Sequence, residues 1–407
     1  MSATAEHVPA RGAHKRMVNQ CAWLFAFALF GYPIVGNVIS FLQIDSRVLS
    51  IPFRITVALF SAWVILTTRR LRIDRLHQVM LLIWFLYIVR LVHDSLVSNL
   101  QGADYAMQFF IASSVLPALA LMKARAFQNR KFALIGFLIA STGTLLSLLA
   151  ALFGNTDVRE VAETSGRLSF AAIDAVSLGN QAVSAILCGV ALWRDANARL
   201  RTLIAFTFMG LLWCLALTGS KGPALALLLC VGLWALRRRQ VWKLATLALP
   251  LLIWLIVSND NPLATRLAGS EEDQSTADRL VIFNDSVAQI ASAPLVGSAF
   301  VELNSGYYPH DVFIEAALAF GIPVALVFLG LMLVGTYKAW RTLNSDYDLL
   351  GLIFFQGLLA AAVSGSIYGS MLLWVTLAML PTAASATRDS RRPLPRSDIS
   401  PSLPARL

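Results

Sequence analysis

The stretch Tyr307–Leu333, YYPHDVFIEAALAFGIPVALVFLGLML, places a single histidine at the start of a long apolar helix. Pro309 disfavours helical backbone at the residue before it, and Asp311 is a good N-cap. Apolar residues then recur at helical spacing. We therefore predict that a helix begins just after His310, which leaves the histidine at the aqueous edge of an apolar segment.

This apolar run is too long to be one straight membrane span. From Asp311 to Thr336 it would measure about 39 Å at about 1.5 Å per residue, whereas a bilayer core requires roughly 30 Å. Gly321 and Pro323 are the natural break. We expect a short helix at the interface that carries Asp311 and Glu315, followed by a spanning helix from about 323 to 338.

Composition extends this conclusion to the whole chain. Hydrophobic residues make up 57% and charged residues 14% of the 407 residues, and mean hydropathy is +0.67. These values exclude an ordinary soluble globule and predict an all-α polytopic membrane protein. Residues 1–407 are expected to form a single transmembrane domain with about 12 spans, within a range of roughly 10 to 12.

The predicted spans lie near residues 19–42, 48–67, 76–95, 105–122, 132–153, 171–193, 202–218, 222–236, 241–257, 312–337, 348–366 and 367–382. The pairs 202–218 with 222–236, and 348–366 with 367–382, are joined so tightly that either pair can instead be a re-entrant hairpin.

Basic residues set the orientation of these spans. With a cytoplasmic N-terminus, most Lys and Arg residues fall on the inside, which fixes both termini in the cytoplasm. This placement accounts for the net charge of +10 without nucleic acid. Residues 258–310 become the largest periplasmic loop, and residues 388–407 form a disordered cytoplasmic tail. The four cysteines lie in apolar runs without CxxC spacing, which predicts neither disulfides nor a thiolate metal site.

Basic residues on the outside need another explanation, because orientation disfavours them. Arg279 is expected in the first turn of an amphipathic helix, Ala277–Ala291, that ends before Pro294. The first turn of a helix favours an anion, not a cation. Arg279 therefore either pairs with a neighbouring acid such as Asp278 or points toward an anionic ligand.

A second outside cation, Lys221, lies in the turn Thr218–Gly222, TGSKG. Its glycines permit close backbone approach, and Pro223 starts a helix whose N-terminus favours an anion. This arrangement suits a phosphate, although any tight turn between two spans can look the same. Arg167 lies in a further outside loop, Gly154–Ala171.

Several polar side chains fall inside or beside the apolar runs. Asp174, Asn180 and Gln181 are costly in hydrocarbon and are expected to face a cavity. A second group, Arg90, His93 and Asp94, either lines the same cavity or, in the case of Arg90, extends toward the interface.

Three stretches together resemble the O-antigen ligase and polymerase superfamily. Ser220-Lys221-Gly222 is similar to the Ser-Arg-Gly turn of that family, with Lys in place of Arg. Arg279, with Pro294-Leu295-Val296-Gly297 after it, is similar to the periplasmic helix and the Pro-Leu-x-Gly segment that ends it. His310, Phe313, Glu315, Gly321 and Ile322 match the third motif, with Asp311 in place of Asn and Ile314 in place of Leu. The segment 166–180 is a looser family feature, and the resemblance covers mainly residues 160–335.

The resemblance implies a GT-C-like lipid-linked oligosaccharide transferase of the bacterial inner membrane, without metal or cofactor. Its donor would be an undecaprenyl-diphosphate-linked glycan, and its acceptor a hydroxyl of a glycan or of lipid A core. Arg279 and Lys221 would bind the diphosphate, and His310 would assist the acceptor hydroxyl as a base, as an orienting group or as a phosphate ligand. Ser220, Arg167, Glu315 and Asp311 are the other expected substrate-binding residues. Asp311 would favour the charged imidazolium if it lies close to His310.

Two alternatives remain open on the sequence alone. Ligase and polymerase share their donor chemistry and differ only in the acceptor. A transporter or flippase for a lipid-linked or anionic substrate also fits about twelve spans. The chain shows neither paired broken helices in matching halves nor many acidic residues within the spans apart from Asp174. Membrane lipids are expected partners in either case.

Overall fold

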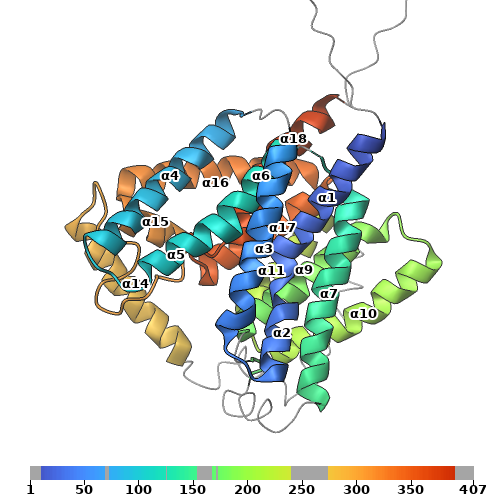
Figure 1. Cartoon of the computed structure of the whole chain (residues 1–407), viewed down its shortest axis with the longest axis horizontal. Helices are drawn as coiled ribbons and strands as arrows, with labels where there is room; N and C mark the ends of the chain where they lie inside the picture. Colours follow the sequence, from blue (N-terminus) through green and yellow to red (C-terminus); the bar gives the residue numbers. More distant parts are fainter. Residues whose placement is uncertain are drawn as a thin grey trace, which may run out of the picture.

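The computed structural model describes residues 11–68, 73–124, 126–153, 167–170, 173–239 and 274–389. Within these ranges the regular elements are helices, apart from one isolated bridge between Phe170 and Ile173 (Figure 1). The predicted all-α class is confirmed for this part of the chain. The tail is described only to Asp389, so nearly all of the predicted disordered segment lies outside the described residues.

The helices follow one another along the chain without strands between them. They are α1 (Arg11–Phe30), α2 (Tyr32–Leu42), α3 (Ser46–Thr67), α4 (Arg75–Leu96), α5 (Ala103–Phe109), a π-helical turn (Phe110–Val115), α6 (Leu116–Ala124), α7 (Asn129–Phe153), α9 (Ala175–Trp193), α10 (Ala198–Leu217), α11 (Lys221–Arg237), α14 (Gln274–Ser292), α15 (Val312–Phe320), α16 (Ile322–Thr342), α17 (Asp348–Ser364) and α18 (Met371–Asp389).

The described residues contain 7 helices that are long and apolar enough to span a membrane, or up to 8 if the bent pair α1 and α2 is one span. The predicted count of about 12 is not confirmed. The expected span 241–257 lies outside the described residues. Two other expected spans became the 17-residue helices α11 and α17. At about 1.5 Å per residue, 17 residues rise about 26 Å, which is less than a bilayer core.

The first expected span, residues 19–42, is broken at Gly31, where α1 and α2 meet at 49°. A Cβ on Gly31 would lie 2.8 Å from the Phe27 carbonyl oxygen and 2.9 Å from the Phe53 ring. Pro33 lies in the first turn of α2, where its missing N–H costs no helical hydrogen bond. The first residues of α1 and the last of α18 lie at the same end of the molecule (Figure 1). Which side of the membrane this end faces stays a prediction.

Helix α9 is the centre of the bundle. It packs against α7, α10, α11 and α17. Of its most apolar 18-residue stretch, 83% is buried inside the protein. Small residues permit this close approach, because a Cβ on Gly189 would meet the Phe208 ring at 2.5 Å. Since α9 exposes so little surface to lipid, it can carry polar side chains along much of its length.

The predicted break near Gly321 and Pro323 is confirmed. Helix α15 ends at Phe320, and α16 runs from Ile322 to Thr342. Gly321 has φ 80° and ψ 170°, a conformation that is open essentially only to glycine. The backbone direction therefore changes at this residue.

This break interlocks with the turn that follows α14. The amide of Ser298 donates to the Leu318 carbonyl at 2.8 Å, and the amide of Ile322 donates to the Pro294 carbonyl at 2.8 Å. A Cβ on Gly321 would lie 2.4 Å from the Leu295 carbonyl carbon. A Cβ on Gly297, whose φ is 70°, would lie 2.4 Å from the Leu318 carbonyl oxygen. Two glycines thus bring two backbone segments into direct contact.

The amphipathic helix predicted for residues 277–291 is confirmed as α14, Gln274–Ser292. The expectation that Arg279 lies in its first turn is wrong, because the helix begins three residues earlier. Arg279 therefore lies beyond the first turn, where the helix dipole acts less strongly. The helix dipole alone therefore does not show that Arg279 needs an anionic partner.

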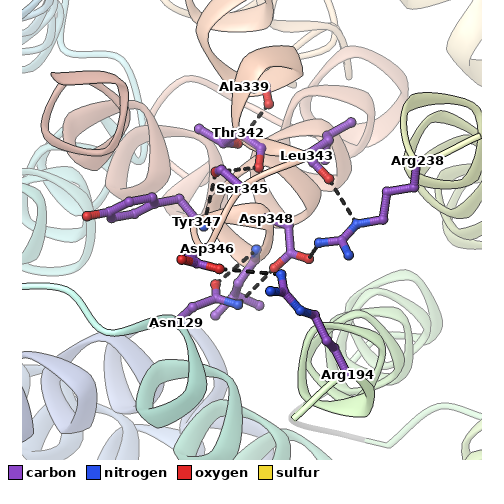
Figure 2. Close-up of polar contacts among 11 residues, drawn as sticks. Asn129, Arg194, Arg238, Ala339, Thr342, Leu343, Ser345, Asp346, Tyr347 and Asp348 are labelled. Carbon is purple, nitrogen blue, oxygen red and sulfur yellow. Dashed lines mark hydrogen bonds and ion pairs between the residues drawn. The ribbon is translucent and has the colours of Figure 1, made fainter. Parts of the chain in front are cut away.

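A polar cluster holds α17 at its first residue (Figure 2). Arg238, just after α11, donates to the Asp348 carboxylate at 2.6 Å, and Asn129 of α7 donates to its other oxygen at 2.8 Å. The Arg238 and Asp348 side chains are 13% and 6% exposed. In the same cluster, Arg194 and Asp346 form a looser pair at 3.4 Å and are 61% and 84% exposed. The buried pair joins α11 to α17, and the exposed pair is a natural control.

We expect Arg238→Met to lower the free energy of unfolding by about 3–5 kcal/mol, because it leaves the buried Asp348 carboxylate without its cation. Arg194→Met removes an exposed pair and should cost about 0–1 kcal/mol. Denaturant unfolding of the purified protein in detergent micelles measures both values. Equal losses of unfolding free energy in the two variants would contradict the conclusion that the buried pair, and not the exposed one, stabilises the fold.

We also expect Gly321→Ala to lower the melting temperature strongly or to prevent folding, because the added Cβ meets backbone atoms at 2.4 Å. The strained dihedrals alone cost about 1–3 kcal/mol. Gly330→Ala in α16 is the matched control, since a Cβ there meets nothing within 4 Å. Size-exclusion chromatography after stepwise heating measures the folded fraction, and equal behaviour of the two variants would refute the interlock.

Candidate functional site

A cavity of about 480 Å³ lies where the start of α9, the junction of α1 with α2, and the turn between α17 and α18 meet. Arg279 from α14 and His310 from the loop before α15 both line it. The family resemblance implies that Arg279 and Lys221 bind the diphosphate and that His310 assists the acceptor. Two of these three residues, Arg279 and His310, are thus brought to one cavity. They come from segments about thirty residues apart in the chain.

Arg279 reaches the end of α17. Its guanidinium donates to the Val363 carbonyl at 3.4 Å and to the Ser364 hydroxyl at 3.3 Å. Both distances are long for N–H···O hydrogen bonds. A guanidinium has five N–H donors, so these two weak bonds leave donors for an anion. An arginine in this arrangement can bind a phosphate group through paired hydrogen bonds.

His310 is held beside Arg279 in an unusual backbone conformation. Its φ of 58° is in the left-handed region, which non-glycine residues seldom adopt and which is found more often at functional sites. Its ring centroid lies 4.5 Å from that of Tyr308, and its side chain hydrogen-bonds to the backbone of Ser364. Its Nδ1 is buried without a hydrogen-bond partner. This nitrogen can therefore accept a proton or a hydrogen bond from a molecule in the cavity.

The imidazole is predominantly neutral near pH 7. Burial lowers the pKa of His310 below its ordinary 6.5, and the positive charge of Arg279 lowers it further. The expectation that Asp311 would favour the imidazolium is wrong. Asp311 instead caps α15 by accepting from the amides of Phe313 at 2.7 Å and Ile314 at 3.2 Å, and burial raises its own pKa.

Glu315 lies outside the cavity lining and is fully buried. Its carboxylate accepts from the Tyr87 hydroxyl at 2.5 Å and from the Ile367 amide at 2.7 Å. Ile367 belongs to the turn that brings Ser366 and Tyr368 to the cavity. Glu315 therefore positions the cavity wall by tying α15 to α4 and to this turn.

The turn around Lys221 lies next to the same end of α17. A Cβ on Gly222 would lie 3.6 Å from the Val363 side chain, and it is the Val363 carbonyl that accepts from Arg279. Lys221 is exposed at the first position of α11 and is not among the residues that line the cavity. The structure thus places this turn beside the Arg279 site but not within the cavity.

Arg167 and Ser220 contact one another, and neither is among the residues that line the cavity. Arg167 donates to the Ser220 hydroxyl at 2.8 Å and to the Thr218 carbonyl at 3.0 Å, and Ser220 donates to the Ala175 carbonyl at 3.0 Å. These bonds hold the turn against the start of α9. A substrate-binding role for either residue stays a prediction.

The expectation that Asp174, Asn180 and Gln181 face a cavity is confirmed, because all three line it. Arg90, His93 and Asp94 are not among the residues that line it. Arg90 donates to Asp94 at 2.6 Å and to the carbonyl of Ser298, and Asp94 accepts from the Phe300 amide at 2.9 Å. Together they fasten the loop after α14 to α4, which explains the buried charges without a ligand.

Sequence reasoning missed the turn between α17 and α18. Ser364, Ser366, Tyr368 and Ser370 line the cavity there, and Tyr308 lines it from the loop before α15. The signal was present, because the segment SGSIYGS at 364–370 is a polar interruption between two apolar runs. Spacing alone indicates only a tight connection between two spans.

Comparison with known proteins identifies a family for part of the chain. No curated protein matches the chain. Residues 206–329 match the model of the O-antigen ligase family, a stretch that contains Lys221, Arg279 and His310. At the level of the family, this match supports an O-antigen ligase-type glycosyltransferase. The resemblance of the chain to the O-antigen ligase and polymerase superfamily is thereby confirmed.

Proposed function

We propose that this protein transfers a glycan from an undecaprenyl-diphosphate donor to an acceptor hydroxyl at the periplasmic face of the bacterial inner membrane. It would act in cell-surface polysaccharide assembly as a GT-C-like enzyme, without a metal ion. The observation that carries the proposal is the meeting of Arg279 and His310 at the end of α17 on one cavity.

The two side chains suit the two charges that arise during the transfer. The acceptor hydroxyl oxygen attacks the anomeric carbon, and its proton passes to Nδ1 of His310. The bond between the anomeric carbon and the phosphate oxygen breaks, and its electron pair leaves with the diphosphate. Arg279 stabilises that anion from a fixed position, which lowers the barrier because no solvent must reorganise.

A neutral imidazole is needed for this role. A general base must be unprotonated before the reaction, and the lowered pKa of His310 keeps it so near neutrality. When the donor diphosphate binds, its negative charge offsets that of Arg279. The pKa of His310 should then rise, and the nitrogen becomes a better proton acceptor as the substrate arrives.

Lys221 belongs to the proposal as a second cation for the leaving group. The turn that carries it packs beside Val363, and the start of α11 adds a partial positive charge. A lysine has no bidentate fork, so its contribution would be that of a point charge. The cavity chemistry does not separate ligase from polymerase, because the donor half is the same for both.

Arg279→Ala and His310→Ala should each abolish surface glycan in a deletion strain while undecaprenyl-linked material accumulates. Arg194→Ala, in the exposed pair at the far end of α17, should restore glycan normally and serves as the control. Gel analysis of surface glycan, with immunoblots for membrane insertion, measures the result. Unattached long polymer in the deletion strain identifies a ligase, and single repeats on lipid identify a polymerase. Normal glycan from both site variants would refute the proposal.

Arg279→Gln should raise the pKa of His310 toward its ordinary value, because the neighbouring positive charge is removed. Arg279→Lys keeps the charge and should leave the pKa low. Titration of ¹³C-histidine signals by NMR measures both, with the His310 signal assigned by its loss in His310→Gln. An unchanged pKa in Arg279→Gln would show that the two groups do not interact.

A further inference from the structure

The wall of the cavity formed by α9 differs in chemistry from the Arg279 and His310 side. Asp174 is the N-cap of α9, and Ser177 and Asn180 follow at intervals of three residues, so the three lie near one face of the helix. They offer a carboxylate, a hydroxyl and an amide. The described residues of this wall bring no basic side chain to the cavity.

Asn180 has a polar atom that the fold does not use. Its Oδ1 is buried and has no hydrogen-bond partner. Among the described residues with such an atom, only Asn180 and His310 line this cavity. A buried polar group without a partner destabilises the folded protein. The neighbouring Gln181 contrasts with it, because its amide donates to the Phe30 carbonyl at 2.8 Å.

Asp174 also keeps capacity for a ligand. One carboxylate oxygen accepts from the amides of Val176 and Ser177, each at 2.9 Å, and the other accepts from the Ser177 hydroxyl at 2.6 Å. A carboxylate offers about four acceptor positions, so one remains for a further donor. Asp174 is exposed in the part of the chain that the structure describes.

Two aromatic rings also line the cavity, and one of them, Tyr308, lies against His310. Tyr308 and Tyr368 lie edge to face with centroids 6.0 Å apart, and both line the cavity. Burial raises the pKa of Tyr308, and the Asp174 carboxylate raises it further, so Asp174 lies within electrostatic reach of this ring. Apolar ring faces beside a few convergent polar groups are typical of sites for small polar ligands.

We infer that the face of α9 carrying Asp174, Ser177 and Asn180, with the rings of Tyr308 and Tyr368, is a subsite for a neutral sugar. This inference rests on the proposed function and deepens it. Sugar hydroxyls both donate and accept, so they satisfy a carboxylate and either orientation of the Asn180 amide. The C–H faces of the sugar would pack on the tyrosine rings. Hydroxyl contacts made here can also strengthen as the sugar approaches the transition state.

The test compares three probes on the purified full chain. They are undecaprenyl diphosphate, the lipid-linked glycan extracted from the deletion strain, and the same glycan released from its lipid by mild acid. Asn180→Ala should weaken binding of at least one glycan probe by about tenfold and leave undecaprenyl diphosphate unaffected. Its melting temperature should stay the same or rise, because the unpaired amide is gone. Gln181→Ala should instead lower the melting temperature, since it removes a hydrogen bond that the fold uses.

The outcomes separate the subsite from the proposed function. Weaker binding of the lipid-linked glycan assigns the subsite to the donor sugar, and weaker binding of the released glycan alone assigns it to the acceptor. Unchanged binding of both glycans to Asn180→Ala overturns the subsite, even if Arg279→Ala no longer binds undecaprenyl diphosphate. If Arg279→Ala binds undecaprenyl diphosphate normally, the proposed function fails instead. A lower melting temperature for Asn180→Ala would show a structural role and would also overturn the inference.

Discussion

The contact between the turn at 293–298 and the break at 320–322 is the constraint on which the site depends. Two backbone hydrogen bonds cross it, Ser298 to Leu318 and Ile322 to Pro294. Gly297 and Gly321 allow the two backbone segments to approach so closely that no side chain fits between them. Helix α14, which carries Arg279, ends at this contact, and α15, which follows His310, ends at it as well. The relative position of α14 and α15 is therefore set by backbone contacts at this point.

Helix α17 is held at both ends, and one of these ends lies at the cavity. At one end of the helix, Asp348 is held by Arg238 and Asn129 (Figure 2). At the other end, Ser364 meets Arg279 and His310. A helix of 17 residues is a stiff rod between the two. Glu315 adds a third tie through the amide of Ile367. The cavity thus lies among elements that are each fixed at more than one point.

Several polar groups around the cavity are left with weak hydrogen bonds or with none. Arg279 makes only long hydrogen bonds, His310 is neutral with Nδ1 unpaired, and Asn180 keeps an unpaired oxygen on the opposite wall. A fold selected only for stability would pair the His310 and Asn180 atoms, because each costs free energy when buried alone. Two unpaired atoms on one cavity are the pattern expected of a binding site. By contrast, Arg90 and Asp94 bond to each other and to the loop after α14, and neither lines the cavity, so they serve the fold.

The sequence by itself determined the features that depend on local backbone chemistry. Asp311 as a cap, the break at Gly321, the extent of α14 to within a few residues, and the cavity-facing character of Asp174 all follow from residue type and spacing. Only the tertiary structure decided which distant groups meet: Ser364 with Arg279, Tyr308 with Tyr368, and Asp94 with the loop after α14. It also decided that Asp311 caps a helix without charging His310, and that apolar runs such as α11 and α17 are shorter than a full span. Local hydrogen bonds and dihedral preferences are encoded within a few residues, whereas pairing and burial depend on segments that only the folded chain brings together.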